Sequence, residues 1–95
     1  MEIIQKNYED SGIIKAMDDN IEIGKMTYVW AGLDKFIIDY TYVKDSYTGE
    51  GIGSELVKSA VDYARDNNIK IIPLCPFASN IFKKNPEYSD VLNFN

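Results

Sequence analysis

The 95-residue chain is long enough for one domain with a single modest core, and its 45% apolar residues are typical of an ordered globular protein. Its net charge of −5 argues against a nucleic-acid partner, because such binding draws on many Lys and Arg side chains, but one small anionic ligand held by main-chain donors remains compatible. The absence of histidine excludes Ser-His-Asp triads, Cys-His pairs and His-based metal sites, and the single cysteine excludes an internal disulfide, so no metal site is expected.

The sequence also lacks the usual signals for export or membrane insertion. No segment approaches the run of about 20 apolar residues needed to span a bilayer. The first six residues lack the basic-then-apolar form of a signal peptide. A cytoplasmic location without membrane association is therefore expected.

The first half of the chain has the pattern of strands joined by short polar turns. Apolar and β-branched residues predict four strands, at residues 2–7, 12–17, 21–30 and 36–43. Within the third strand the apolar residues change face around Gly24, which predicts a bulge or a bend there. We expect these strands to pair antiparallel.

The spacing of the apolar residues changes after the fourth strand. One apolar stripe at residues 52–64 predicts a helix of about four turns, which Asn67-Asn68 can end. Residues 69–74 are apolar enough for a fifth strand in the centre of the sheet. A helix with proline in its first turn is expected at residues 76–85, followed by a turn or short helix at residues 86–92.

This order of elements predicts an α+β fold in which helices pack on a mixed, mostly antiparallel sheet. The fourth strand, the long helix and the fifth strand form a strand–helix–strand unit. Such a unit should be a right-handed crossover that places its two strands parallel.

Three glycines at alternate positions, Gly49, Gly51 and Gly53, lie between the fourth strand and the long helix. This placement lets unobstructed N–H groups meet at a helix N-terminus, which suits a phosphate or pyrophosphate. Two more specific phosphate-binding motifs do not match this sequence. A P-loop needs Gly-Lys-Ser/Thr, and the dinucleotide fingerprint needs a glycine where Ser54 stands. A tight turn that only lets the helix pack closely on the sheet is the structural alternative.

The segment 43–53 resembles the acetyl-CoA-binding motif of the GNAT N-acetyltransferase superfamily, written Gln/Arg-x-x-Gly-x-Gly/Ala. Here the motif becomes Thr48-Gly49-Glu50-Gly51-Ile52-Gly53, in which the two key glycines match and Thr48 replaces the leading Gln or Arg. The loss removes one side chain that can support the pyrophosphate, while the backbone donors remain.

The resemblance continues through Pro73-Leu74-Cys75-Pro76 and Asn85-Pro86-Glu87-Tyr88, so the chain looks like the short Yjdj-type branch of GNAT-like domains. That branch carries a His just before the residue equivalent to Thr41, where this chain has Tyr40. The resemblance implies the GNAT-like acyl-CoA N-acyltransferase fold, as a single domain over residues 1–95.

The resemblance also implies a cleft for acetyl-CoA where the fourth and fifth strands splay apart. Backbone contacts to pantetheine are implied for Tyr42, Val43 and Lys44. The amides of the glycine loop would cradle the pyrophosphate; these belong to Gly49, Glu50, Gly51, Ile52, Gly53 and Ser54. Further contacts to CoA are implied at the last helix, for Pro76, Phe77, Asn80 and Lys84, although a solvated face is the commoner role for a residue such as Lys84.

Acetyl transfer to an amine needs a neutral amine, stabilisation of the oxyanion and a proton for the leaving thiolate. The resemblance places Cys75 at the position proposed as nucleophile or proton relay, and a helix N-terminus favours a thiolate. The alternative is that Cys75 is a small buried hydrophobic residue. Tyr40 alternates with Thr41 on a strand of which one face should pack in the core, yet its phenol can face the cleft as a proton donor.

The sequence thus predicts an acetyl-CoA-binding N-acetyltransferase whose amine acceptor is unidentified. Because the first 45 or so residues form strands, the acceptor site should be shallow, which suits a protein or peptide amine or a site completed by a partner. Two alternatives stay open. One is a non-catalytic CoA-binding module or sensor, and the other is an interaction domain in which the glycine loop is only structural.

Overall fold

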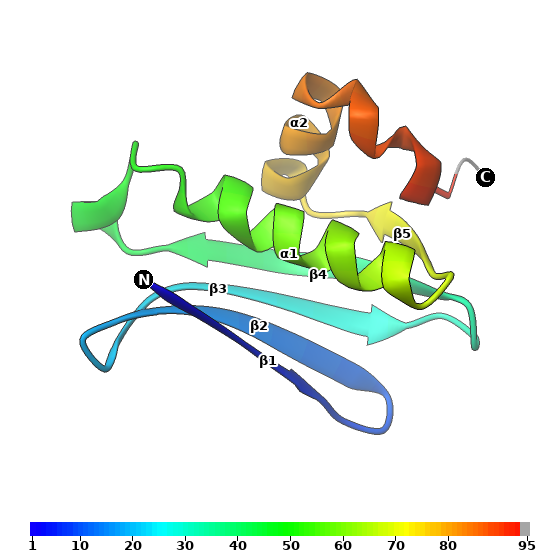
Figure 1. Ribbon diagram of the computed structural model, residues 1–95, viewed down its shortest axis with the longest axis horizontal. Coiled ribbons are helices and arrows are strands. Elements are labelled where there is room, and N and C mark those ends of the chain that lie inside the picture. The colour runs from blue at the N-terminus through cyan, green and yellow to red at the C-terminus, as the bar shows by residue number, and fades with distance from the viewer. Residues whose placement is uncertain (94–95) are drawn as a thin grey trace.

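Five strands form one sheet in which each strand neighbours the next along the chain (Figure 1). The structure, a computed structural model, describes residues 1–93. Strands β1 to β4 pair antiparallel, and β5 pairs parallel with β4, so the predicted mixed α+β fold is confirmed. The bounds are Glu2–Asn7 for β1, Ser11–Asp18 for β2, Ile21–Trp30 for β3, Lys35–Val43 for β4 and Lys70–Pro73 for β5.

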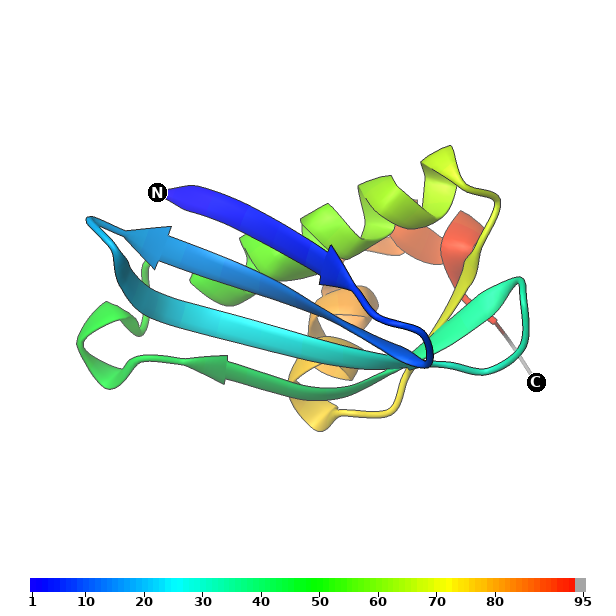
Figure 2. The same ribbon diagram turned by 90° about the horizontal axis from the view of Figure 1, so that it is seen from below.

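Both α-helices cover the same face of this sheet. They are α1 (Ile52–Asp66) and α2 (Pro76–Lys84), and two short 3₁₀ helices, η1 (Asp45–Tyr47) and η2 (Pro86–Val91), precede and follow them. Seen from below, the strands lie in front of both helices (Figure 2). No helix within residues 1–93 covers the other face, which we call the open face. In the same part of the chain, no helix is long and apolar enough to cross a membrane.

The apolar stripe of α1 fills the space above β2, β3 and β4. Its buried members are Ile52, Leu56, Val57, Ala60, Val61 and Ala64. They pack with the inward side chains of the sheet, among which Tyr28 stacks on Phe36 at a centroid distance of 4.3 Å. The helix ends as predicted, because Asn68 adopts a left-handed φ of 56° after it.

The predicted irregularity in β3 is confirmed and lies at Ile23, beside Gly24. Ala16 pairs with Gly24 while Met17 pairs with Glu22, which leaves Ile23 without a partner on β2. This extra residue lets Ile23 face the core as Met26 does.

The predicted central position of β5 is wrong, because β5 is an edge strand. Its apolar character has another cause. The helices bury Ile71 from one face, and the end of the described chain covers its outer edge, where Asn93 N donates to Ile71 O at 3.0 Å. Ile71 of the edge strand is therefore buried without a sixth strand, and an apolar residue suits this position.

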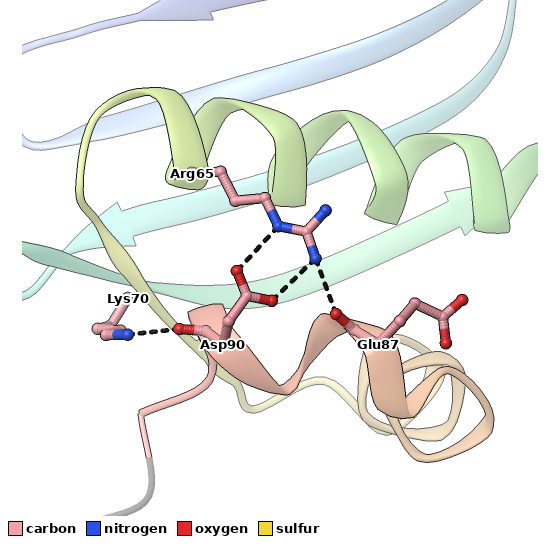
Figure 3. A network of polar contacts seen from close by, with 4 residues as sticks. All are labelled: Arg65, Lys70, Glu87 and Asp90. Carbon is pink, nitrogen blue, oxygen red and sulfur yellow. Dashed lines mark hydrogen bonds and ion pairs between the residues drawn. The ribbon is translucent and has the colours of Figure 1, made fainter.

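A polar clamp fastens η2 to the end of α1 (Figure 3). The Arg65 guanidinium donates from Nε and Nη2 to the two carboxylate oxygens of Asp90, at 2.9 and 2.8 Å, and from Nη2 to the Glu87 carbonyl at 2.8 Å. Lys70 Nζ donates to the Asp90 carbonyl. This bidentate pair fixes the segment that shields β5.

Candidate functional site

One edge of β4 becomes free halfway along the strand. Pairing with β5 stops at Ile38, whose carbonyl accepts hydrogen bonds from both Leu74 N and Cys75 N at 3.1 Å. At the end of the strand Lys44 N donates to Ile23 O, toward β3. Because backbone groups alternate in direction along a strand, the N–H and C=O groups of Thr41 and Val43 point to the free edge. The free edge therefore begins where β5 ends at Pro73, and β4 continues alone to Val43.

A groove of about 470 Å³ lies between this free edge and the helices. Its walls come from β4, from the loop that joins η1 to α1, and from α2. Eight of its lining residues were predicted from the sequence as CoA contacts: Tyr42, Val43, Gly49, Gly51, Ile52, Gly53, Ser54 and Phe77. Four others, Thr41, Tyr47, Thr48 and Ile81, were not. Two of these had a signal in the sequence, since Thr41 alternates with Val43 along the strand and Ile81 follows Phe77 by one helical turn.

Gly49 and Gly51 give the loop its shape. Their φ angles are 88° and 79°, in the left-handed region that favours glycine, and a side chain at either position would meet no atom within 4 Å. Glycine is thus needed there for conformation, and the backbone around both residues stays uncovered.

Gly53 has a different role, because it lies buried in the first turn of α1. A Cβ atom at this position would lie 2.2 Å from the ring of Phe77. The missing side chain therefore lets α2 dock against the start of α1 and close one side of the groove.

The N-terminus of α1 opens into the groove without a side-chain cap. The first hydrogen bond of the helix runs from Glu55 N to Gly51 O at 3.0 Å. The N–H groups of Ile52, Gly53 and Ser54 precede that bond and have no acceptor within the helix. These donors and the partial positive charge of the helix end suit an anion.

Tyr47 ties the glycine loop to the turn between β2 and β3. Its phenol donates to Asp18 Oδ2 at 2.9 Å, and this hydrogen bond to a carboxylate raises the pKa of Tyr47. Its ring also packs against the core. The loop is therefore held at both its start and its helical end.

Cys75 lies where β5 gives way to α2, at the residue that precedes the helix. It is buried, and its Sγ lies 3.6 Å from Thr41 Oγ1, so the thiol adjoins the groove through Thr41. Tyr40 points the other way, because it alternates with Thr41 and lies on the open face, where Lys25 Nζ is 5.9 Å from its ring centroid. The structure thus brings Cys75 and Thr41 together and leaves Tyr40 apart from them.

The remaining predicted contacts lie outside the groove wall and are exposed to solvent. Lys44 follows β4 and Glu50 lies in the loop, while the others belong to α2. The latter are Pro76, Asn80 and Lys84. Contact of these residues with CoA stays a prediction. Within residues 1–93 no group of three acidic or Cys side chains is placed to hold a metal ion.

Residues 13–91 match the family model described as GCN5-related N-acetyl-transferase. The chain belongs to this family. The resemblance to the GNAT superfamily is confirmed. A GCN5-like putative N-acetyltransferase from Staphylococcus aureus, solved by NMR, is 36% identical over 99% of this chain and 89% of that chain, with a TM-score of 0.73.

Two further comparisons give a relative in sequence and a similar solved structure. Protein NATD1 from Gallus gallus is 30% identical over 61 residues, which cover 64% of this chain and 56% of that protein. The chain thus spans about half the length of this curated relative. The aminoglycoside N-acetyltransferase AAC(6')-Iy, solved in complex with CoA, has a TM-score of 0.64 over 87% of this chain and 88% of that chain. At 13% identity, this last similarity shows the GNAT-like fold alone.

Proposed function

We propose that this chain binds acetyl-CoA in the groove beside β4 and transfers the acetyl group to an amine. The observation that carries the proposal is the uncapped N-terminus of α1, which opens into a groove bordered by the free edge of β4. Membership of the GCN5-related N-acetyltransferase family supports it, as does the complex of AAC(6')-Iy with CoA.

In this proposal the pyrophosphate and the pantetheine arm of CoA are both recognised by main-chain groups. The pyrophosphate would meet the N–H groups of Ile52, Gly53 and Ser54, in the loop shaped by Gly49 and Gly51. The pantetheine arm would pair with the free backbone groups of Thr41 and Val43, like an added strand. Main-chain recognition of this kind is compatible with an acidic protein and with Thr48 in place of Gln or Arg.

The acetyl group would then lie near the point where β5 leaves β4. The amine nitrogen attacks the carbonyl carbon, the C–S bond breaks, the amine loses a proton and the CoA thiolate gains one. Cys75 and Thr41 are the paired polar side chains at this point, so we assign Cys75 one of two roles. It relays a proton to the CoA thiolate in this direct transfer, or its thiolate first takes the acetyl group with release of the CoA thiolate and the amine then attacks the Cys75 thioester and frees the Cys75 thiolate. Tyr40, on the other face of β4, is the weaker candidate for proton donor.

Calorimetry with wild-type protein and the variant Gly51→Asp tests whether CoA binds in the groove beside the glycine loop. An aspartate there places negative charge beside the pyrophosphate, and we expect affinity to fall by about tenfold or more. Gly32→Asp is the matched control, because Gly32 also has a left-handed φ, 98°, but lies in the turn before β4. No heat from wild-type protein with CoA, or equal affinity in Gly51→Asp and Gly32→Asp, would overturn the assignment.

Turnover separates an enzyme from a CoA-binding sensor. Consumption of acetyl-CoA should depend on the added amine, and mass spectrometry should find the acetylated acceptor. Cys75→Ala should retain CoA binding and lose most turnover. Full turnover in folded Cys75→Ala assigns the thiol to packing, and CoA binding without turnover on any amine favours the sensor.

A further inference from the structure

The two edges of the sheet differ in how they are covered. At β5 the end of the described chain covers the edge, since Asn93 N donates to Ile71 O. At β1 no strand and no backbone hydrogen bond of residues 1–93 occupies the outer edge (Figure 1). The pairing of β1 with β2 also runs from Glu2 to Asn7 without a shift, and β1 contains no proline. Bulges, prolines and covering segments are the usual protection of a sheet edge, so β1 is open to another strand.

The β1–β2 hairpin shows which residues of β1 offer hydrogen bonds at this outer edge. Tyr8 N donates to Ser11 O at 2.8 Å, so the backbone groups of Tyr8 face β2. Backbone groups alternate in direction along a strand, and every second residue before Tyr8 therefore faces β2 as well. The residues between them present their N–H and C=O groups to the outer edge. They are Ile3, Gln5 and Asn7.

The same three residues are held in place by their side chains. Gln5 Nε2 donates to the Tyr28 hydroxyl at 2.8 Å, and that hydroxyl donates to Asn7 Oδ1. Tyr28 is buried, and Ile3 packs against the core. The outer edge of β1 is thus fixed before any partner arrives, which lowers the entropic cost of pairing.

The sequence of β1 complements itself when a two-fold axis passes beside Ile4. In this register Ile4 lies opposite Ile4 of a second copy, and Ile3 lies opposite Gln5, so the outward backbone groups meet in hydrogen-bonded pairs. Glu2 then lies opposite Lys6. The symmetry of the axis forms each of these unlike pairs twice.

The charges select this register among those that keep the hydrogen bonds. Glu2, Ile4 and Lys6 alternate with the anchored residues, so their side chains lie on the open face. Glu2 and Lys6 are exposed, and neither forms an ion pair within the described residues. In a non-hydrogen-bonded pair opposite Cα atoms are about 4.5 Å apart, which brings the two charges within reach. The other registers place Glu2 against Glu2, Lys6 against Lys6, or a charge against Ile4.

We propose that two copies of this chain pair through antiparallel β1 strands around Ile4 and join their sheets into one. Main-chain hydrogen bonds at Ile3 and Gln5 hold the strands, the two Ile4 side chains cover each other, and two Glu2–Lys6 ion pairs fix the register. The β1 strand lies at the edge of the sheet opposite β5, so each copy keeps its own groove beside β4. The pairing uses both β1 edges and β5 is covered, so assembly stops at the dimer.

Sedimentation velocity of untagged protein over a series of concentrations measures this dimer. Glu2→Lys and Lys6→Glu each turn both attractive contacts into repulsive ones, and we expect either change to weaken the dimer by about tenfold or more. The double variant Glu2→Lys/Lys6→Glu exchanges the two charges and should regain wild-type affinity. Lys83→Glu is the matched control, because it changes the net charge as Lys6→Glu does but lies exposed on α2. It should dimerise like wild type.

A mixture of the two single variants gives the sharper test. Each alone opposes like charges, whereas in the mixed dimer both contacts join a lysine to a glutamate. Native mass spectrometry should therefore find the mixed dimer in preference to either homodimer. Circular dichroism of each variant checks that the fold is intact, as expected for exposed positions.

The outcomes decide between a second copy and other occupants of this edge. Wild-type protein that stays monomeric over the whole series overturns the proposal. A dimer that both charge reversals leave unchanged lies elsewhere on the molecule and overturns it too, as does a mixture that forms no mixed dimer. Monomeric protein that binds an unrelated extended peptide through Lys6 assigns the edge to a peptide partner and overturns the second copy.

Discussion

The three glycines of the loop have different structural roles, although the sequence motif treats them alike. Gly49 and Gly51 are needed for their left-handed backbone, while Gly53 is needed for the space that Phe77 fills. The sequence spacing could not reveal this difference, because the contact joins Gly53 in α1 to Phe77 in α2, 24 residues further along the chain. The same applies to Cys75 and Thr41, which are 34 residues apart and meet only in the folded chain.

Because Gly53 lies close to the Phe77 ring, the effect of Gly53→Ala on the free energy of unfolding should change sign when that ring is removed. Gly53→Ala in the wild-type background must displace the Phe77 ring, and we expect a loss of about 1 kcal/mol of unfolding free energy. In a Phe77→Ala background the same change meets no ring. There it should stabilise α1 by about 0.5–1 kcal/mol, the usual advantage of Ala over Gly in a helix.

Urea denaturation of the four proteins measures this cycle. Gly32→Ala, in a turn where a Cβ meets nothing closer than 3.9 Å, separates local packing from backbone strain. If Gly53→Ala has the same effect with and without the Phe77 ring, the ring does not set the requirement for glycine.

At the scale of elements, β4 consists of two parts that differ in their strand pairing. Residues 36–38 are paired on both edges and belong to the scaffold, whereas residues 39–43 have no partner on β5. The change occurs where a bulge on β4 coincides with the end of β5. Strand positions were predictable from residue pattern, but the point at which pairing stops depends on where α2 begins.

The clamp between α1 and η2 predicts how stability changes in acid. The hydrogen bond from Arg65 lowers the pKa of Asp90 below the ordinary range of an aspartate. A carboxyl whose pKa is lower in the folded state stabilises the fold above its unfolded pKa, and this contribution disappears as pH falls through the folded pKa. Asp90→Asn should therefore lower the thermal midpoint at neutral pH, and the difference from wild type should shrink below about pH 4.

Thermal melts between neutral and strongly acidic pH check this expectation. Asp62→Asn is the control, because Asp62 makes an exposed pair with Lys58 at 3.2 Å within one helix, an arrangement that contributes little. A difference between wild type and Asp90→Asn that stays constant across the whole pH range would show that the clamp acts through shape and not through charge.

At the scale of the whole molecule, both α-helices lie on one face of the sheet and leave the other face uncovered within residues 1–93 (Figure 2). This asymmetry follows from the connections, since the turns that join β1 to β4 carry no helix and α1 and α2 both follow β4. The shallow acceptor site expected from the sequence stays a prediction. For an acidic molecule the proposed binding of anionic CoA has to rely on local donors, and the uncapped start of α1 offers them.

The sequence by itself determined the elements and the position of the glycine loop. Hydrophobic period, turn residues and glycine spacing are local signals, so they located β3, α1, the proline start of α2 and the bulge beside Gly24. Eight residues of the groove were predicted for the same reason, because most of them are contiguous with the glycine motif.

The tertiary structure alone decided three things. They are the edge position of β5, the face on which Tyr40 lies and the bulge in β4, where Asp39 has no strand partner on β3. The physical reason is common to them. An apolar strand can be shielded by neighbouring strands or, as here, by helices and a trailing segment, and sequence pattern records burial without recording what covers it. Likewise, a bulge changes which face each later residue occupies, and only the pairing with the neighbouring strand fixes its position.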